Sequence, residues 1–301
     1  MSIEVRRARD DDYEAVAAFT ADTWGEDVTD YIPDIYHEWI ADDGDRQRTV
    51  VADAGDDIAG LCQVVRLSEY EAWAQGMRVN PEYRGQGIGL QVVDAIADWA
   101  ADRGATRMHN MVFSWNEAGL GQSRAAGFDP AAEFRWAHPE PDADAAPSLS
   151  VVDDPDAAWG YWVHSDARTH LSGLALDPTE TWACSALTRE RLHDAAENRR
   201  VIAVQDDDRT RGMAVRTRLQ DRENEAGETE TWAEYGVGAW ADGEAAQSVL
   251  SAVAADAAAE GADRTRVLIP ETTRTVSDVA VARVGISDEP TFCLSMDLSR
   301  R

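Results

Sequence analysis

The chain has 301 residues, a length that suggests about two domains at roughly 150 residues each. Its 28 positive residues are all arginine, and they stand against 57 Asp and Glu, which leaves a formal net charge of −29. This charge repels nucleic-acid backbones and anionic lipid, so we expect neither nucleic acid nor a membrane as a partner. We interpret the acid excess as a halophilic solvation adaptation to a very salty cytosol, with an acidic interaction surface as the alternative.

The sequence predicts a cytoplasmic protein. The N-terminal segment is charged from Glu4 onward and lacks the apolar core of a signal peptide. No run reaches the roughly 18 apolar residues that a spanning helix needs. The cysteines, Cys62, Cys184 and Cys293, are odd in number and widely spaced, and the histidines show no ligand spacing. We therefore expect buried thiols, no disulfide and no metal site.

In the first half, the pattern predicts two strands within residues 48–65, joined by an acidic glycine turn. An alternating strand follows, ending at Val79. Apolar residues at helical spacing then predict a helix over residues 90–104, and Gly104 ends it. A short strand over residues 107–113 completes this set.

The second half repeats these elements in the same order. Strands are predicted within residues 201–215, a helix from Val249 to Gly261, and a strand over residues 264–269. Residues 137–150, with three prolines and several acids, read as an extended linker between the halves. The predicted organisation is a domain at 1–138, a linker at 139–150 and a domain at 151–301, in the α/β class.

The strongest local signal is a glycine-rich loop, Arg84–Gly89, which lies between the predicted strand and helix. Glycines let consecutive amides point inward, and a helix N-terminus adds partial positive charge, so the loop can cradle an anion such as a pyrophosphate. No Gly-Lys-Ser/Thr follows, which excludes a Walker loop. The glycines are also too closely spaced for the dinucleotide-binding fingerprint.

With this loop, its strand and helix, Asn116 and the later Gly127-Phe128 pair, residues 1–136 resemble the GNAT acetyltransferase superfamily. The resemblance implies two tandem GNAT-like domains, each a mixed, mostly antiparallel sheet flanked by helices. It also implies acetyl-coenzyme A (acetyl-CoA) as co-substrate and no metal. Its pyrophosphate would be bound by the loop residues Arg84, Gly85, Gln86, Gly87, Ile88 and Gly89.

The resemblance assigns the rest of the coenzyme site to strand and loop residues. The strand end at Met77, Arg78 and Val79 would hydrogen-bond the pantetheine arm and polarise the thioester carbonyl. Asn116 would cap the pantetheine side of a cleft where two parallel strands separate.

Two positions depart from the family pattern. The family commonly has a tyrosine as general acid four residues before the Gly-Phe pair, where this chain has Ser123. Many relatives also carry a carboxylate in the strand before Met77, where this chain has Gln75, which cannot act as a base. In a regular strand Glu71 lies on the same face as Gln75 and Met77, so Glu71 is the candidate base. The alternative is that Glu71 is only an acid on the surface. A bulge near Gly76 would break this alternation of faces.

The second half lacks the cradle. At the matching position stands Ala241–Ala246, with one glycine and two acids that would repel a pyrophosphate. We therefore expect residues 151–301 to be a degenerate GNAT-like domain that binds no coenzyme.

The leading hypothesis is an acetyl-CoA-dependent N-acetyltransferase in which a primary amine attacks the thioester directly. The acceptor would be a small molecule or a peptide, and neither it nor the oligomeric state can be inferred from the sequence. One alternative is a non-catalytic acyl-CoA-binding or regulatory module, because Ser123 and Gln75 replace the family's acid and base. The other is an interaction protein whose glycine loop is vestigial.

Overall fold

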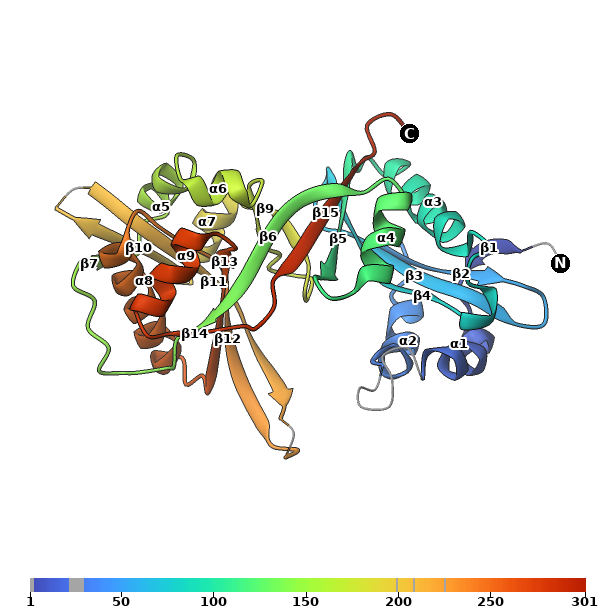
Figure 1. Ribbon diagram of the computed structural model, residues 1–301, viewed down its shortest axis with the longest axis horizontal. Coiled ribbons are helices and arrows are strands. Elements are labelled where there is room, and N and C mark those ends of the chain that lie inside the picture. Colours follow the sequence, from blue (N-terminus) through green and yellow to red (C-terminus); the bar gives the residue numbers. More distant parts are fainter. Residues whose placement is uncertain (1–2, 22–29, 199, 208, 225) are drawn as a thin grey trace. The chain divides into compact units, whose positions relative to one another are not determined.

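The computed structural model describes residues 3–21, 30–198, 200–207, 209–224 and 226–301, and these form two compact units. Of the described residues, the first unit comprises those within 1–112, 116–130 and 294–301, and the second comprises those within 113–115 and 131–293. Figure 1 shows both as sheets flanked by helices. Among the described helices, none combines the length and the apolar character that a membrane span requires.

The first unit is built mainly from the N-terminal part of the chain. In chain order its elements are β1 (Glu4–Arg7), the 3₁₀ helix η1 (Asp10–Asp12), α1 (Tyr13–Thr20), α2 (Ile32–Ala41), β2 (Gln47–Asp53), β3 (Ile58–Arg66), β4 (Glu71–Val79), the 3₁₀ helix η2 (Pro81–Tyr83), α3 (Ile88–Ala101), β5 (Arg107–Phe113) and α4 (Glu117–Ala125). The sheet order β1-β2-β3-β4-β5 follows the sequence, and β4 and β5 run parallel while the other pairs are antiparallel.

Helices cover both faces of this sheet, with α1 and α2 on one side and α3 on the other (Figure 1). The predicted helix is confirmed and begins at Ile88, directly after the glycine loop. Its apolar stripe is buried as the spacing predicts, with Val92, Val93, Ile96, Ala97 and Ala100 all inside. The bulge that the sequence left possible near Gly76 is present: the register of β4 with β3 shifts there, and Gly76 has φ +64°. The alternation that sets Glu71 and Met77 on one face of a regular strand is therefore broken between Gln75 and Arg78.

The last residues of the chain complete the first unit. The segment Leu294–Arg301 belongs to it, and β15 (Thr291–Asp297) is the strand next to β5 in the sheet. The Leu298 amide donates to the carbonyl oxygen of Thr106 at 2.8 Å, and Arg301 pairs with Asp94 at 2.8 Å. No local sequence pattern signals a partner so far along the chain.

The second unit holds most of the remaining chain. Its elements are β6 (Asp129–His138), β7 (Ser150–Val152), α5 (Pro155–Trp162), α6 (Asp166–His170), β8 (Leu174–Leu176), β9 (Cys184–Ala186), α7 (Arg189–Ala196), β10 (Val201–Asp206), β11 (Arg209–Glu223), β12 (Thr229–Trp240), α8 (Gly243–Ala259), β13 (Arg264–Pro270), α9 (Thr273–Val281), β14 (Gly285–Ile286) and the first part of β15. Its main sheet contains the order β6-β13-β12-β11-β10-β7, β14 pairs with β6, and β8 and β9 form a separate two-stranded sheet.

The second unit repeats the element order of the first. The antiparallel pair β11–β12 is followed by α8, then by β13 parallel to β12, and then by α9, just as β3, β4, α3, β5 and α4 follow one another. The predicted apolar face of α8 is buried, with Val249, Leu250 and Val253 in the core against β12 and β13. The predicted strand over residues 264–269 is confirmed as β13.

The proline-rich segment between the sequence halves packs on the second unit. The Asp142 amide donates to the carbonyl oxygen of Ala254 in α8 at 3.0 Å, and the Ser148 hydroxyl lies 2.9 Å from that of Ser248. Residues 131–138, which the sequence analysis places in the first domain, also belong to this unit. The three cysteines are buried, as predicted.

Candidate active site

The predicted anion cradle lies between η2 and α3. The Asn80 side chain accepts a hydrogen bond from the Glu82 amide at 3.1 Å and donates to the Ile58 carbonyl oxygen at 3.1 Å, which fixes the turn after β4. Gly85 and Gly87 then have φ of +76° and +77°. A Cβ at either position would meet nothing within 4 Å, so the space in front of this backbone is open.

The first turn of α3 directs unsatisfied amides toward this open space, because the first N–H groups of any helix lack an intrahelical acceptor. The Gln91 amide donates to the Gly87 carbonyl oxygen at 3.2 Å and so begins the helical ladder. Gly89 is buried against α4, where a Cβ would come 2.1 Å from Nε2 of Gln122. Gly89 thus serves helix packing, whereas Gly85 and Gly87 shape the exposed loop.

The pairing between β4 and β5 ends before β4 reaches the cradle. The parallel register between β4 and β5 runs from Glu71↔Arg107 to Trp73↔His109, while β4 continues to Val79. The predicted separation of two parallel strands is therefore present. Beyond Trp73, β4 and β5 share no further register pair among the described residues.

The side chain of Arg78, one of the strand residues predicted to contact the coenzyme, points away from the edge of β4 that faces β5. Its guanidinium pairs with the buried carboxylate of Asp30, with Nε 2.6 Å from Oδ2, and lies over the Tyr31 ring at 5.4 Å. This buried ion pair joins β4 to the start of α2. Arg78 can therefore serve a ligand at the strand edge through its backbone.

Glu71 lies at the start of β4, in the paired part of the strands. Its carboxylate is 3.2 Å from the Ser68 hydroxyl and 3.5 Å from Nε2 of His109. His109 is 3% exposed, and neither ring nitrogen has a hydrogen-bond partner among the described residues. Sequence reasoning missed His109, because a single histidine in a strand carries no pattern until the pairing sets it beside a carboxylate.

Ser123 is buried in α4, where its hydroxyl oxygen accepts a hydrogen bond from Nδ2 of Asn110 on β5 at 2.9 Å. The hydroxyl hydrogen is left to donate elsewhere. Asn116 is the N-cap of the same helix, and its side-chain oxygen accepts from the Gly119 amide at 2.9 Å. Asn116 thus fixes the start of α4.

Gln75 belongs to a row of hydrogen-bonded side chains on neighbouring strands of the sheet. Its Nε2 donates to the side-chain oxygen of Gln63 at 2.7 Å, and Gln63 donates to the Thr49 hydroxyl at 3.2 Å. Cys62 donates to the Gln75 carbonyl oxygen at 3.2 Å, and burial raises the pKa of this thiol to about 12. Cys62 therefore stays protonated at neutral pH and is no nucleophile.

The matching position of the second unit carries an acidic cap. The Asp242 carboxylate accepts the Ala245 amide at 3.1 Å at the start of α8, and this hydrogen bond lowers the pKa of Asp242. Arg211 also pairs with this carboxylate. A pocket of about 220 Å³ lies beside β12 and α9, and the indole nitrogen of Trp240, one of its lining residues, donates to Asp278 at 3.1 Å.

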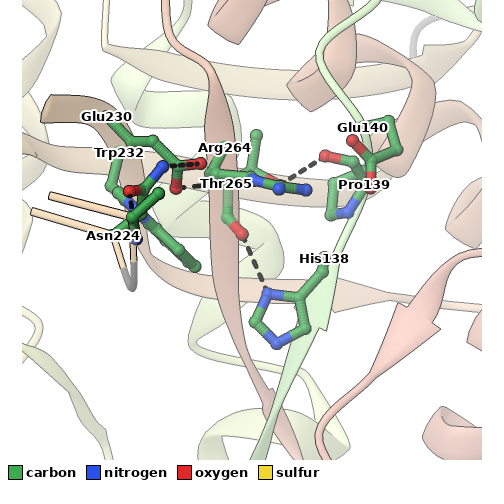
Figure 2. A pocket seen from close by; sticks show the side chains of 9 residues that line it. His138, Pro139, Glu140, Asn224, Glu230, Trp232, Arg264 and Thr265 are labelled. Carbon is green, nitrogen blue, oxygen red and sulfur yellow. Dashed lines mark hydrogen bonds and ion pairs between the residues drawn. The ribbon is translucent and has the colours of Figure 1, made fainter. Parts of the chain in front are cut away.

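A larger pocket of about 540 Å³ opens elsewhere on the second unit (Figure 2). Nδ1 of His138 lies 2.9 Å from the Thr265 carbonyl oxygen, and Arg264 lies 3.6 Å from Glu230. The Trp232 ring forms part of the wall. Among the described residues, no group of three or more His, Cys, Asp or Glu side chains is arranged to hold a metal ion.

Comparisons with known proteins agree with this geometry. Residues 12–128 match the family described as the acetyltransferase (GNAT) family. A thialysine N-epsilon-acetyltransferase of Bos taurus is 32% identical over 66 residues, which are 22% of this chain and 39% of that protein. The corresponding enzyme of Sus scrofa is 31% identical over 64 residues, 19% of this chain and 38% of that protein. The chain therefore matches less than two fifths of the length of these curated relatives.

A solved structure extends the likeness over the whole chain at the level of fold. The GCN5-related N-acetyltransferase of Sphaerobacter thermophilus aligns with 98% of this chain and 96% of its own, with a TM-score of 0.57 and 15% identity. Residues 12–128 are thus similar to the acetyltransferase (GNAT) family, and the likeness of the whole chain is one of fold.

Proposed function

We propose that the protein is an acetyl-CoA-dependent N-acetyltransferase whose site lies in the first unit. The observation that carries this proposal is the combination of the open glycine cradle at the start of α3 with the end of the β4–β5 pairing at Trp73. Together they offer amides for a pyrophosphate and an extended backbone for an amide-containing arm.

The described residues fit the coenzyme. Amides of Arg84–Gly89 would hold the pyrophosphate, since Gly85 and Gly87 leave the space in front of them open. The strand Met77–Val79 would hydrogen-bond the pantetheine arm. Bound acetyl-CoA supplies the activated acetyl group. A backbone amide at the end of β4 would then stabilise the oxyanion that develops when the acceptor amine attacks.

Proton transfer is assigned to the groups at the closed end of the β4–β5 pairing. Glu71 would take the proton of the acceptor amine through water, and His109, at the last paired position, stands between Glu71 and the part of the strands beyond the pairing. Ser123 can donate a hydrogen bond to the leaving thiolate, because its oxygen already accepts from Asn110 and its O–H remains available. The thiolate of a thiol with an ordinary pKa near 8.5 leaves with little assistance.

The acceptor class is a small-molecule or peptide amine. The curated relatives are named as N-epsilon-acetyltransferases of thialysine, an amine acceptor, which supports a primary amine here. We place the protein in the cytoplasm. The second unit is a degenerate GNAT-like domain, because it repeats the element order but caps α8 with Asp242 where a pyrophosphate would bind. The wider proposal is thus a tandem protein with one working coenzyme site.

A second candidate function is a coenzyme-binding module without catalysis. It is favoured by Ser123 and Gln75, both of which are engaged in hydrogen bonds within the fold. This candidate predicts acetyl-CoA affinity without release of free thiol on any amine.

Calorimetric titration of acetyl-CoA in molar KCl tests the proposal, followed by a screen of amines with detection of the released thiol. We expect a stoichiometry of one and turnover on at least one primary amine. A stoichiometry of two would overturn the assignment of the second unit. Absence of binding to folded protein would overturn both the enzyme and the binding-module proposals.

A further inference from the structure

A buried carboxylate in the second unit is surrounded by three arginines. Glu234 on β12 is fully buried, and Arg218 on β11 approaches it with Nε 2.9 Å from Oε2. Nη2 of Arg266 on β13 lies 2.6 Å from Oε1, and Arg222 pairs with the same oxygen. These side chains share one face of the sheet because Arg218 and Arg266 are the register partners of Glu234.

The charges of this cluster do not balance. Three guanidinium groups surround the one carboxylate that pairs with them among the described residues, so a local charge of +2 remains in a chain whose net charge is −29. The pKa of Arg266 is lowered to about 10, and burial is the largest cause. Glu234 raises this pKa, whereas the neighbouring Arg222 and Arg218 lower it further. An uncompensated buried charge is costly, and an anion would relieve that cost.

Two tryptophan rings contact the Arg266 guanidinium of the cluster. The Arg266 guanidinium lies 4.1 Å from the Trp182 ring and 4.5 Å from the Trp136 ring. Trp182 is 37% exposed and has φ +63°, a backbone conformation that a large side chain rarely adopts. Such strained residues cluster at functional sites.

The aromatic surface continues beyond Trp182. Phe113 lies edge-on to it at 6.4 Å and stacks on Trp115 with 5.4 Å between ring centroids and 5° between planes. Trp115 is 55% exposed. At the other end, Arg222 lies 5.9 Å from the Trp182 ring and is the most exposed guanidinium of the cluster. Flat apolar surface and excess positive charge therefore meet at Trp182.

We propose that Phe113, Trp115, Trp182 and Arg222 form a binding site, the tryptophan–arginine face, for a small carboxylate with a planar apolar body. Arg222 binds the carboxylate, because a guanidinium presents a planar fork of donors and still reaches solvent here. The exposed rings of Trp182 and Trp115 contact the flat body. The charge excess selects an anion, and the rings select against small inorganic ions.

The competing explanation is purely structural: the cluster would only hold the β11–β12 hairpin to β13. The two explanations differ in their response to a ligand. A structural cluster has no affinity for an aromatic carboxylate, whereas a site built on charge excess distinguishes that carboxylate from its neutral amide.

The test uses indole-3-acetate as probe and indole-3-acetamide as its uncharged counterpart, titrated into the full chain by calorimetry in KCl. We expect indole-3-acetate to bind with a stoichiometry of one and the amide to bind about tenfold more weakly or worse, since a charge-assisted hydrogen bond is lost. Equal affinities, or no binding of indole-3-acetate to folded protein, would overturn the proposal.

Variants locate the site. Arg222→Leu and Trp182→Leu should each weaken indole-3-acetate binding by about tenfold or more. The matched control is Arg264→Leu, an exposed arginine that lines the 540 Å³ pocket and pairs with Glu230 outside the cluster (Figure 2). It should leave binding unchanged, and an equal loss in this variant would overturn the assignment. Trp182→Leu keeps the test valid if Arg222→Leu fails to fold, and acetyl-CoA affinity should be unchanged in every variant.

Discussion

Trp73 and His109 form the last register pair that joins β4 to β5. Beyond this pair, β4 continues for six residues to Val79 and β5 for four residues to Phe113 without further pairing to each other. Parallel strands that separate in this way can accommodate an extended ligand between their backbones. The position of this pair therefore fixes where the candidate site begins.

Gly87→Glu should abolish acetyl-CoA binding, with a loss of about a hundredfold or more in affinity. The residue faces open space at the start of α3 with φ +77°, so the new carboxylate would enter the cradle and repel the pyrophosphate. Calorimetric titration with acetyl-CoA measures the loss.

Two controls separate charge from strain in that experiment. Gly121→Glu adds the same charge to α4 at an exposed glycine that also has open space, and it should bind acetyl-CoA as the wild type does. Gly87→Ala introduces only the left-handed strain, about 1–2 kcal/mol, and should keep most of the affinity. A Gly87→Glu variant that binds normally would contradict the placement of the coenzyme.

Glu71→Gln should lower kcat/KM by about a hundredfold if Glu71 takes the amine proton, and it should remove the acidic limb of the pH–rate profile. The coenzyme Kd should stay unchanged, because Glu71 lies at the far end of β4 from the cradle. Glu69→Gln is the matched control, an exposed neighbouring acid with no expected effect. A loss below about threefold in Glu71→Gln would exclude this base.

The local elements of both units could be predicted because each depends on its own residues. The strand over residues 107–113 and the buried stripe of α3 follow from apolar periodicity, and the cradle follows from glycines placed between a strand and a helix. The bulge at Gly76 was foreseen as a possibility for the same reason, since a glycine within a strand often marks one.

Long-range partners could not be predicted in this way. Leu294–Arg301 joins the first unit, although no local pattern connects it to residues near Thr106. The pairing of His109 with Glu71, and of Glu234 with arginines from two strands, likewise depends on register between distant segments. A single sequence carries no signal for such register beyond the burial pattern of each strand.

Gly76→Ala should destabilise the first unit more than Gly55→Ala. Both glycines have positive φ, so both variants carry a backbone strain of about 1 kcal/mol or more. At Gly76 the added Cβ would also lie 2.4 Å from the Trp39 ring of α2, whereas at Gly55 it would meet nothing within 4 Å. Overpacking adds about 1–3 kcal/mol, which urea unfolding resolves. Equal losses in the two variants would contradict the close packing of α2 on the bulge.

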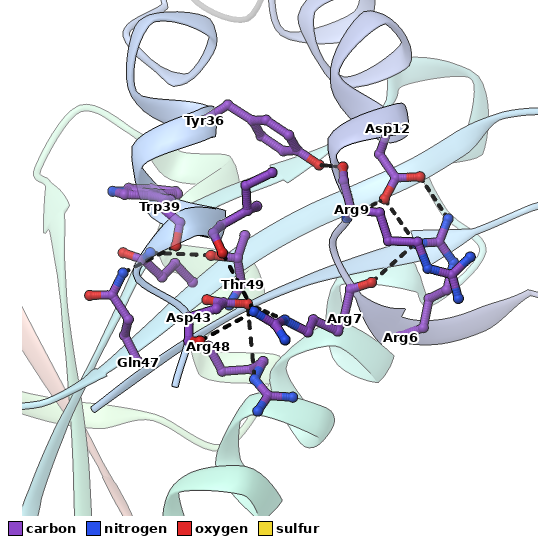
Figure 3. Close-up of polar contacts among 12 residues, drawn as sticks. Arg6, Arg7, Arg9, Asp12, Tyr36, Trp39, Asp43, Gln47, Arg48 and Thr49 are labelled. Atoms are coloured by element: carbon purple, nitrogen blue, oxygen red, sulfur yellow. Dashed lines mark hydrogen bonds and ion pairs between the residues drawn. The ribbon is translucent and has the colours of Figure 1, made fainter. Parts of the chain in front are cut away.

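An ion network at the N-terminal edge of the first unit should make its stability depend on pH (Figure 3). Arg6 donates to both carboxylate oxygens of Asp12, at 2.8 and 2.7 Å, and the Arg9 amide donates to the same carboxylate at 2.7 Å. Burial alone would raise the pKa of Asp12, but these hydrogen bonds outweigh it and lower the pKa. Arg6 also pairs with Asp53 at 2.6 Å, which ties β1 to β2.

Because the pKa of Asp12 is lower in the folded chain, its stabilisation is fully present above the ordinary carboxyl pKa of about 4 and is lost as the pH falls through the folded-state pKa. Asp12→Asn should therefore lower the unfolding free energy by about 1–3 kcal/mol at pH 7, because hydrogen bonds to a charged group are removed. Urea unfolding at pH 7 and at pH 3 should show the difference from wild type shrinking at the lower pH. Asp11→Asn, at the exposed neighbour, should change stability by less than about 0.5 kcal/mol at either pH. If the unfolding free energies of wild type and Asp12→Asn differ by the same amount at both pH values, the Asp12 carboxylate does not stabilise this edge through its charge.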